Sequence, residues 1–234
     1  MTLKIYGIGA SRAARPLWTA LELGVPFEHI ATPYAAGATR TPEFLALNPN
    51  GHIPVVVDER PEGVVTVWES MACALYIARV HGQADGQSIT PATPREEAEA
   101  LRWSFWTVTE LEKDALTVLM HRMAMPADQR KPELAEQAEN RLKVPLAVLE
   151  KHLQTQNAQG QHFLAADRFT VADVCVASVA SWIRPAGALL AQYPAVSSWL
   201  HACVERPAQK QARGMKLGDA VAQAHGCLRS PLKA

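Results

Sequence analysis

Three short motifs in the first third of the chain combine side chains that can bind an anion or activate a nucleophile. The first is Ser11, which follows a β-type run that stops at Gly7 and Gly9 and opens an apolar-periodic stretch. At a strand-to-helix turn, backbone N–H groups and the positive end of the helix dipole converge, and both favour an anion. Taken alone, an ordinary N-cap role is the simpler explanation of a serine at this position.

The second motif is Ile53-Pro54, which follows a turn signal at residues 48–51. A proline is tolerated as the first residue of a strand, and this explains the motif without any function. A cis peptide bond is the functional alternative. It would turn the N–H and C=O of Ile53 outward, where they can pair with an extended peptide.

The third motif is Glu69-Ser70, at the junction of a strand and the next helix. A helix cap with a dipole-compensating carboxylate accounts for the pair. It also suits a ligand that carries an α-amino and an α-carboxylate group. Glu69 would accept from the ammonium, while Ser70 and the helix N–H groups would bind the carboxylate.

The elements that must position these motifs form a βαβ unit followed by a ββα unit. We predict strands over 3–8, 27–30, 53–58 and 64–68, with helices from Ser11 to the Gly24–Pro26 stop and over 69–80. The strand-helix-strand order implies a parallel pair with a right-handed crossover, and the hairpin adds antiparallel strands. This is an α/β fold.

The rest of the chain is predicted to be helical. Residues 82–94 contain Gly, Ser, Thr and Pro without periodicity, which is typical of a linker. Helices are expected over 95–123, 132–153, 170–182 and 193–204, with Thr170 and Asp173 forming a capping box. We therefore predict domains at 1–81 and 95–234, joined by the linker 82–94.

Composition narrows the class of protein. With 48% hydrophobic and 20% charged residues, and 23 basic against 23 acidic residues, the chain is typical of a globular protein and has no net field for nucleic acid or a membrane surface. No leader or membrane span is recognised, so we expect a cytoplasmic protein.

The four cysteines form no Cys-x-x-Cys, which indicates neither a metal site nor a redox dithiol. Three are expected to be buried, and Cys227 is a candidate exposed thiol.

The motifs together resemble the glutathione-binding domain of the cytosolic glutathione transferase superfamily. The resemblance is carried by Tyr6-Gly7-x-x-Ala10-Ser11-x-x-x-Arg15, Asn48-Pro49-x-Gly51-x-Ile53-Pro54 and Glu69-Ser70-x-Ala72, and it extends to the capping segment at 169–174 and to Tyr193-Pro194-x-Val196-x-x-Trp199. It implies a thioredoxin-like N-terminal domain, an all-helical C-terminal domain and a homodimer. The run at 11–18 is most similar to bacterial, serine-type members of the phi, zeta and theta kind.

The resemblance also implies roles for individual residues. Ser11 matches the serine that hydrogen-bonds the glutathione sulfur, while Arg15 matches a helix arginine that is usually structural. Glutathione would further meet Ile53, Pro54, Glu69, Ser70, His52 and Arg40 or its neighbour Thr41. A second-substrate pocket is expected at Ala10, Arg12 and Trp106, although an aromatic on this helix is usually core and an arginine usually solvated.

The implied activity is attack of the glutathione thiolate on a small hydrophobic electrophile or a peroxide, as in detoxification. Glutathione is then a co-substrate, and no metal or cofactor is expected. The absence of cysteine at position 11 argues against the thiol-disulfide members. A glutathione-dependent isomerase, an ether-cleaving enzyme, a dehalogenase and a non-catalytic ligand-binding scaffold remain open, because the fold serves all of them.

Overall fold

A four-stranded mixed sheet forms the N-terminal part of the chain in the computed structural model, which describes residues 2–35 and 37–216. The strand order is β2-β1-β3-β4, with β1 and β2 parallel and the other two pairs antiparallel. The elements follow in the order β1 (Thr2–Tyr6), α1 (Ala14–Glu22), β2 (Glu28–Ile30), α2 (Pro42–Leu47), β3 (Val55–Arg60), β4 (Gly63–Trp68) and α3 (Ser70–His81). The predicted βαβ–ββα order and the α/β class are confirmed.

Each face of this sheet has its own apolar cluster, because successive strand residues point to opposite sides. Ile5 and Val56 pack with residues of α1 and α3 in the large core of the molecule. Val55 and Val57 point the other way and pack with Phe44 of α2. No helix was predicted between the strands at 27–30 and 53–58, so α2 was missed, although Thr41 caps it and Pro42 is its first residue.

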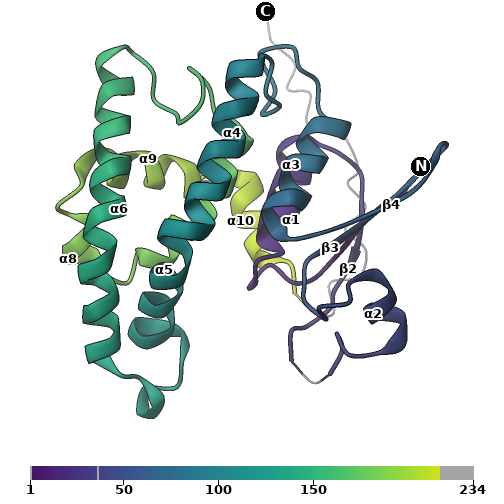
Figure 1. Ribbon diagram of the computed structural model, residues 1–234, viewed down its shortest axis with the longest axis horizontal. Coiled ribbons are helices and arrows are strands. Elements are labelled where there is room, and N and C mark those ends of the chain that lie inside the picture. Colours follow the sequence, from purple (N-terminus) through teal and green to yellow (C-terminus); the bar gives the residue numbers. More distant parts are fainter. Residues whose placement is uncertain (1, 36, 217–234) are drawn as a thin grey trace, which may run out of the picture.

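The C-terminal part is built from helices (Figure 1). Its elements are α4 (Pro94–Trp106), η1 (Thr107–Leu111), α5 (Glu112–Leu119), η2 (Met120–Ala124), η3 (Ala127–Gln129), α6 (Pro132–Ala158), α7 (Val171–Ala180), η4 (Ser181–Ile183), α8 (Gly187–Leu190), α9 (Pro194–Val204) and α10 (Pro207–Gly214). In Figure 1 the long α6 stands on one side and the sheet on the other, and α10 lies between them, packed against α1.

The predicted helix over 95–123 is the main difference. It is divided by two π-helical turns, η1 and η2, which flank α5. Apolar spacing of three and four residues does not reveal such a turn, because one π turn adds a single residue to the pattern. The short α8 and α10 were also missed. None of the described helices is both long and apolar enough to cross a membrane.

The capping box at the start of α7 is present and fully buried. The Thr170 backbone N–H donates to Asp173 Oδ2 at 2.9 Å, and Trp199 Nε1 donates to Asp173 Oδ1 at the same distance. Burial raises the pKa of Asp173 to about 6, against these hydrogen bonds. The carboxyl group thus joins α7 to α9, a structural role as predicted.

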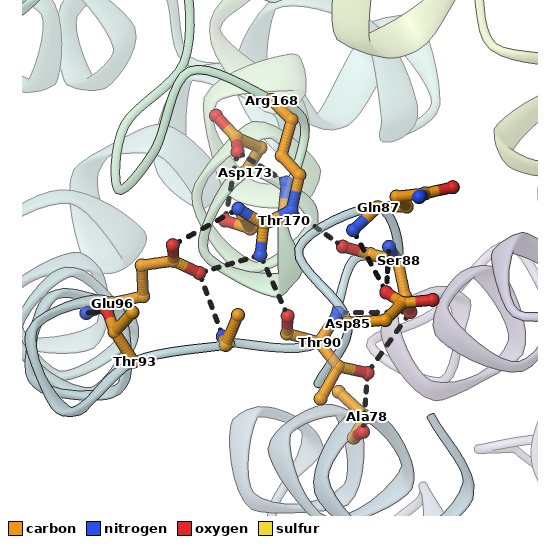
Figure 2. Close-up of polar contacts among 11 residues, drawn as sticks. Ala78, Asp85, Gln87, Ser88, Thr90, Thr93, Glu96, Arg168, Thr170 and Asp173 are labelled. Carbon is orange, nitrogen blue, oxygen red and sulfur yellow. Dashed lines mark hydrogen bonds and ion pairs between the residues drawn. The ribbon is translucent and has the colours of Figure 1, made fainter. Parts of the chain in front are cut away.

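Residues 82–93, between α3 and α4, lie outside the helices and strands and are held by one arginine (Figure 2). Arg168 donates from Nε to Ser88 O at 2.9 Å and from Nη2 to Thr90 O at 3.0 Å, and it pairs with Glu96 of α4 at 2.6 Å. Thr90 Oγ1 in turn donates to Ala78 O of α3 at 2.8 Å. Residues 82–93 are therefore held both to α3 of the N-terminal part and to α4 of the C-terminal part.

Candidate functional site: one edge of the sheet

The three motifs meet at one edge of the sheet because of the strand register. Tyr6, at the end of β1, lies opposite Val55, at the start of β3, and Val55 lies opposite Trp68, at the end of β4. Ser11 follows the first of these positions, Ile53-Pro54 precedes the second and Glu69-Ser70 follows the third. Residues that are nearly 60 positions apart in the chain thus lie at one edge of the sheet and form one candidate site.

Ser11 does not cap α1. The helix begins at Ala14, and its N-cap position is Ala13. Ser11 lies in the preceding turn, where its Oγ donates to Ile8 O at 2.7 Å and accepts from the Ala13 N–H at 3.1 Å. The expectation that α1 starts at Ser11 was wrong, because the chain first makes this tight turn.

The turn satisfies three of the backbone N–H groups that were expected to be free at this helix start. The Ser11 N–H donates to Ile8 O, the Ala14 N–H to Ser11 O, and the Arg15 N–H to Arg12 O. The half-buried hydroxyl of Ser11 is a donor that can be redirected to a ligand, since rotation about one bond releases it from Ile8.

The peptide bond between Ile53 and Pro54 is cis, so this alternative of the sequence analysis is confirmed. Ile53 is 9% exposed and packs with Val55. The turn before it depends on Gly51, which has a φ of +62° and lies so close to the backbone that a Cβ would be 2.9 Å from Thr39 O. Only glycine suits both requirements.

Arg40 and His52 are both exposed beside this turn. Arg40 Nη1 donates to Asn50 O at 3.2 Å, and the His52 backbone oxygen accepts from Asn48 Nδ2 at 2.8 Å. The turn thus holds two exposed side chains with basic groups next to Ile53. Their assignment to glutathione stays a prediction.

Glu69 and Ser70 differ sharply in environment. Glu69 is exposed, has a φ of 71° and makes no side-chain hydrogen bond to the first turn of α3, so it does not cap the helix by its side chain. Ser70 is 4% exposed, and its Oγ accepts from Arg15 Nη1 at 2.5 Å. The positive end of α3 is left without a side-chain cap, which favours an anion there.

The residues expected to form a second-substrate pocket lie on two elements. Ala10 is exposed in the β1–α1 turn, and Arg12 is exposed, pairs with Glu112 of α5 and lies over the Trp182 ring. Trp106 is half-buried and packs edge-on against buried Trp103, with 5.1 Å between ring centroids. These contacts turn Arg12 toward the helical part, and the pocket assignment of all three stays a prediction.

Two structural features of this region escaped the sequence analysis. Gly9 donates its N–H to Met215 O at 2.8 Å, so the end of α10 lies directly on the Ser11 turn. Buried Glu112 faces both Arg12 and Arg15. Neither contact has a local sequence signal, because the partners are about 100 or 200 residues apart.

The described cysteines take no part in this site. Cys73, Cys175 and Cys203 are buried and unpaired, and burial raises the pKa of each thiol, that of Cys175 to about 11. A thiol with so high a pKa is a poor nucleophile at neutral pH. Cys227 and the rest of the segment 217–234 lie outside the described residues. Within the described part of the chain, no group of three or more His, Cys, Asp or Glu is placed to hold a metal ion.

Comparison with known proteins identifies the class that this fold and site represent. Residues 1–79 match the family model described as glutathione S-transferase, N-terminal domain, and residues 113–207 match the model of the C-terminal domain. The chain belongs to the glutathione S-transferase family.

Individual relatives cover most of the chain. Glutathione S-transferase 3 of Zea mays is 32% identical over 216 residues, covering 88% of this chain and 90% of the relative. The disulfide-bond oxidoreductase YfcG of Escherichia coli K12 is 30% identical, with 85% and 88% covered. Among solved structures, glutathione transferase URE2P6 of Phanerochaete chrysosporium in complex with oxidized glutathione is 26% identical, with a TM-score of 0.72 over 90% of this chain and 94% of that one.

Proposed function

We propose that the chain is a glutathione transferase in which the Ser11 hydroxyl stabilises the thiolate of bound glutathione for attack on a small electrophile. The observation that carries this proposal is the strand register, which brings Ser11, Ile53 and Glu69-Ser70 to one edge of the sheet. Family membership and the relative named glutathione S-transferase 3 support it.

The proposed binding mode follows the polarity of the site. The N–H and C=O of Ile53 pair with the peptide backbone of glutathione. Glu69 accepts from the γ-glutamyl ammonium, while Ser70 and the start of α3 bind its carboxylate. Arg40 and His52 then face the glycyl end from the turn before Ile53, and the electrophile enters beside Ala10, Arg12 and Trp106.

The proposed chemistry is a shift in thiol ionisation. A free thiol has a pKa of about 8.5, so only a few per cent is ionised at neutral pH. The Ser11 hydroxyl would turn from Ile8 O to the sulfur, while its Oγ keeps the hydrogen bond from the Ala13 N–H. That second bond polarises the hydroxyl and makes it a better donor to the thiolate.

The test is a titration of thiolate ultraviolet absorbance with glutathione bound to the wild type and to Ser11→Ala. We expect a bound-thiol pKa about 2 units below that of free glutathione in the wild type, and a rise of about 1 unit in Ser11→Ala. Ser181→Ala is the control, because Ser181 lines the same small cavity as Ser11 but donates to Ser178 O. An unshifted pKa in both the wild type and Ser11→Ala would leave Ser11 as a turn residue only.

A second candidate, reduction of disulfides by glutathione, is supported by the similarity to the relative named disulfide-bond oxidoreductase. Because the described cysteines are buried, the nucleophile would be the thiolate of glutathione itself. It attacks a disulfide sulfur, the S–S bond breaks and one thiol leaves, and a second glutathione resolves the mixed disulfide to oxidised glutathione and a second thiol. Parallel assays with a small symmetrical disulfide and with an aryl halide separate the two activities.

We further propose a cytoplasmic homodimer that acts in detoxification, on the basis of family membership. Light scattering of the purified chain tests the dimer.

A further inference from the structure

Arg15 is a fully buried cation that joins three parts of the molecule. It is 1% exposed, and all three guanidinium nitrogens donate: Nε to Ser178 Oγ at 2.9 Å, Nη1 to Ser70 Oγ at 2.5 Å and Nη2 to Glu112 Oε2 at 3.1 Å. A buried charge is costly unless it is paired and hydrogen-bonded. Because each of the three nitrogens has a hydrogen-bond acceptor, the fold holds this guanidinium in one orientation.

The charges around Arg15 do not balance. Glu112 is the one carboxylate that pairs with Arg15 among the described residues, and it pairs with Arg12 as well. Two guanidinium groups and one carboxylate leave one net positive charge. This charge lies next to Ser70, at the positive end of α3. A carboxylate bound at Ser70 would neutralise it.

The hydrogen bond from Arg15 also sets the direction of the Ser70 hydroxyl. Since Oγ accepts from the guanidinium, the proton of the hydroxyl points away from Arg15. No contact within residues 2–35 and 37–216 accepts that proton. Hydrogen bonds in series polarise one another, so a hydroxyl that accepts from a cation is a stronger donor to an anion.

The helical part of the chain supplies the counter-charge at a distinctive position. Glu112 comes directly after the π-helical turn η1, and the adjacent Leu111 and Glu112 are both buried. Single π turns within helices occur often at functional sites, where they redirect side chains. Here the turn precedes the residue that reaches across to α1.

We propose that Arg15 is a positioning residue for the α-carboxylate of the γ-glutamyl end of glutathione, an inference that rests on the proposed function. It orients the Ser70 hydroxyl, and together with Arg12 and Glu112 it leaves the net positive charge that this carboxylate neutralises. Recognition of glutathione in the N-terminal part thus depends on Glu112, a side chain of the helical part.

The test compares glutathione with its analogue in which the γ-glutamyl α-carboxylate is an amide. For the wild type we expect glutathione to bind at least tenfold more tightly than the amide, because only the carboxylate accepts a charge-assisted hydrogen bond. Arg15→Lys keeps the charge but cannot hold Ser70, Glu112 and Ser178 together, so the KM for glutathione rises about tenfold while kcat stays within about twofold. The preference for glutathione over the amide falls.

Glu112→Gln should shift the same preference in the opposite direction. The substitution removes the carboxylate that pairs with Arg12 and Arg15, so the carboxylate of glutathione meets a higher positive charge. The preference for glutathione over the amide therefore rises about threefold or more. A merely structural role would weaken both ligands alike in both variants. Ser178→Ala is the matched control, because it removes one bond to Arg15 without contact to Ser70, and it leaves the preference unchanged.

Binding is measured by calorimetry on variants whose melting temperature exceeds the assay temperature. A double-mutant experiment with Ser70→Ala tests the proposal in a second way. In a Ser70→Ala background, Arg15→Lys should cause no further loss of preference. The proposal is overturned if Arg15→Lys and Glu112→Gln shift the preference in the same direction or leave it unchanged. If the wild type binds neither ligand, the proposed function itself fails, which is a different result.

Discussion

Glu69 adopts a backbone conformation that is unfavourable for its residue type. Its φ of 71° makes it the one non-glycine residue with positive φ in the described ranges 2–35 and 37–216. Such a conformation costs about 1–3 kcal/mol and persists where the surroundings determine it. The side chain that bears this cost is exposed and makes no capping hydrogen bond, so local stability does not explain it. The proposed contact of the Glu69 carboxylate with glutathione would account for this conformation.

We predict that Glu69→Gly stabilises the protein and weakens glutathione binding. Glycine adopts positive φ without strain but loses more entropy on folding, so the net gain in the free energy of unfolding is about 1 kcal/mol. Urea denaturation measures it, and the KM for glutathione reports the loss of the carboxylate. Glu69→Gln keeps the strain and should show no gain. Equal stability of the two variants would argue against strain at this position.

The candidate site residues were largely recognisable from sequence, because each belongs to a short local motif. Ser11, Ile53-Pro54 and Glu69-Ser70 stand at element boundaries marked by glycine, proline and hydrophobic patterning. The role proposed for Arg15 was not recognisable from sequence. It depends on Ser70, Glu112 and Ser178, which are 55, 97 and 163 positions away, and no local pattern encodes such contacts.

At the scale of elements, a buried carboxylate joins the C-terminal end of α3 to β3. Asp58 is fully buried, and its Oδ2 accepts from Tyr76 Oη at 2.8 Å and lies 2.9 Å from His81 Nε2. Burial alone would raise the pKa of Asp58, but the hydrogen bonds from Tyr76 and His81 outweigh it and hold the pKa below its usual value. Tyr76 itself has a pKa raised to about 12, chiefly by burial, so it remains a donor at every working pH.

We predict that Tyr76→Phe destabilises the protein by about 1.5–3 kcal/mol at pH 7, the usual value of a hydrogen bond to a charged group. Because the folded-state pKa of Asp58 lies below the unfolded value, its contribution is present above pH ~4 and is lost as the pH falls further. The difference between wild type and variant should therefore shrink below pH ~4. Denaturant unfolding at pH 7, 5 and 3.5 measures it.

Tyr193→Phe is the matched control for this pH dependence. The Tyr193 hydroxyl donates to a backbone oxygen, that of Lys143 at 3.1 Å, so its contribution has no titrating partner. A constant difference for both variants across this pH range would show that Asp58 does not contribute to stability through its charge.

The order of the elements was predictable at this scale, but several boundaries were not. Period-2 and period-3.6 patterning gave the strands and the long helices. The start of α1 was misplaced by three residues because the turn from Ile8 to Ala13 has helix-like composition. The π turns η1 and η2 were missed because an added residue leaves the spacing of Thr107, Leu111 and Ala115 at four, as in an α-helix.

At the scale of the whole molecule, polar contacts between distant segments hold the two parts of the chain together. Arg12 and Arg15 reach Glu112 across their interface, and Arg206 of the segment before α10 pairs with Glu22 of α1 at 2.6 Å. The candidate site thus lies where the two parts join, and its geometry depends on their relative placement. The sequence predicted both parts, but the side chains that fix this placement are distant in the chain.

Arg168 makes a further set of such contacts away from the candidate site. Its guanidinium donates to two backbone oxygens of the connection between α3 and α4 and to the carboxylate of Glu96 (Figure 2). The Glu96 carboxylate also accepts from the Ala92 N–H at 2.9 Å. The hydrogen bond from Arg168, against the cost of burial, lowers the pKa of Glu96.

We predict that Arg168→Lys lowers the free energy of unfolding by about 2 kcal/mol, because lysine cannot bind Ser88 O, Thr90 O and Glu96 together. A double-mutant cycle with Glu96→Gln should give a coupling of about 1 kcal/mol or more, since both residues belong to one network. Lys210→Gln is the control: its pair with Glu205 is exposed, and such a pair contributes little that can be measured. If Arg168→Lys behaves like Lys210→Gln, apolar packing rather than this network fixes residues 82–93. In that case Arg168→Lys would also leave the KM for glutathione unchanged, since the relative placement of the two parts would not depend on it.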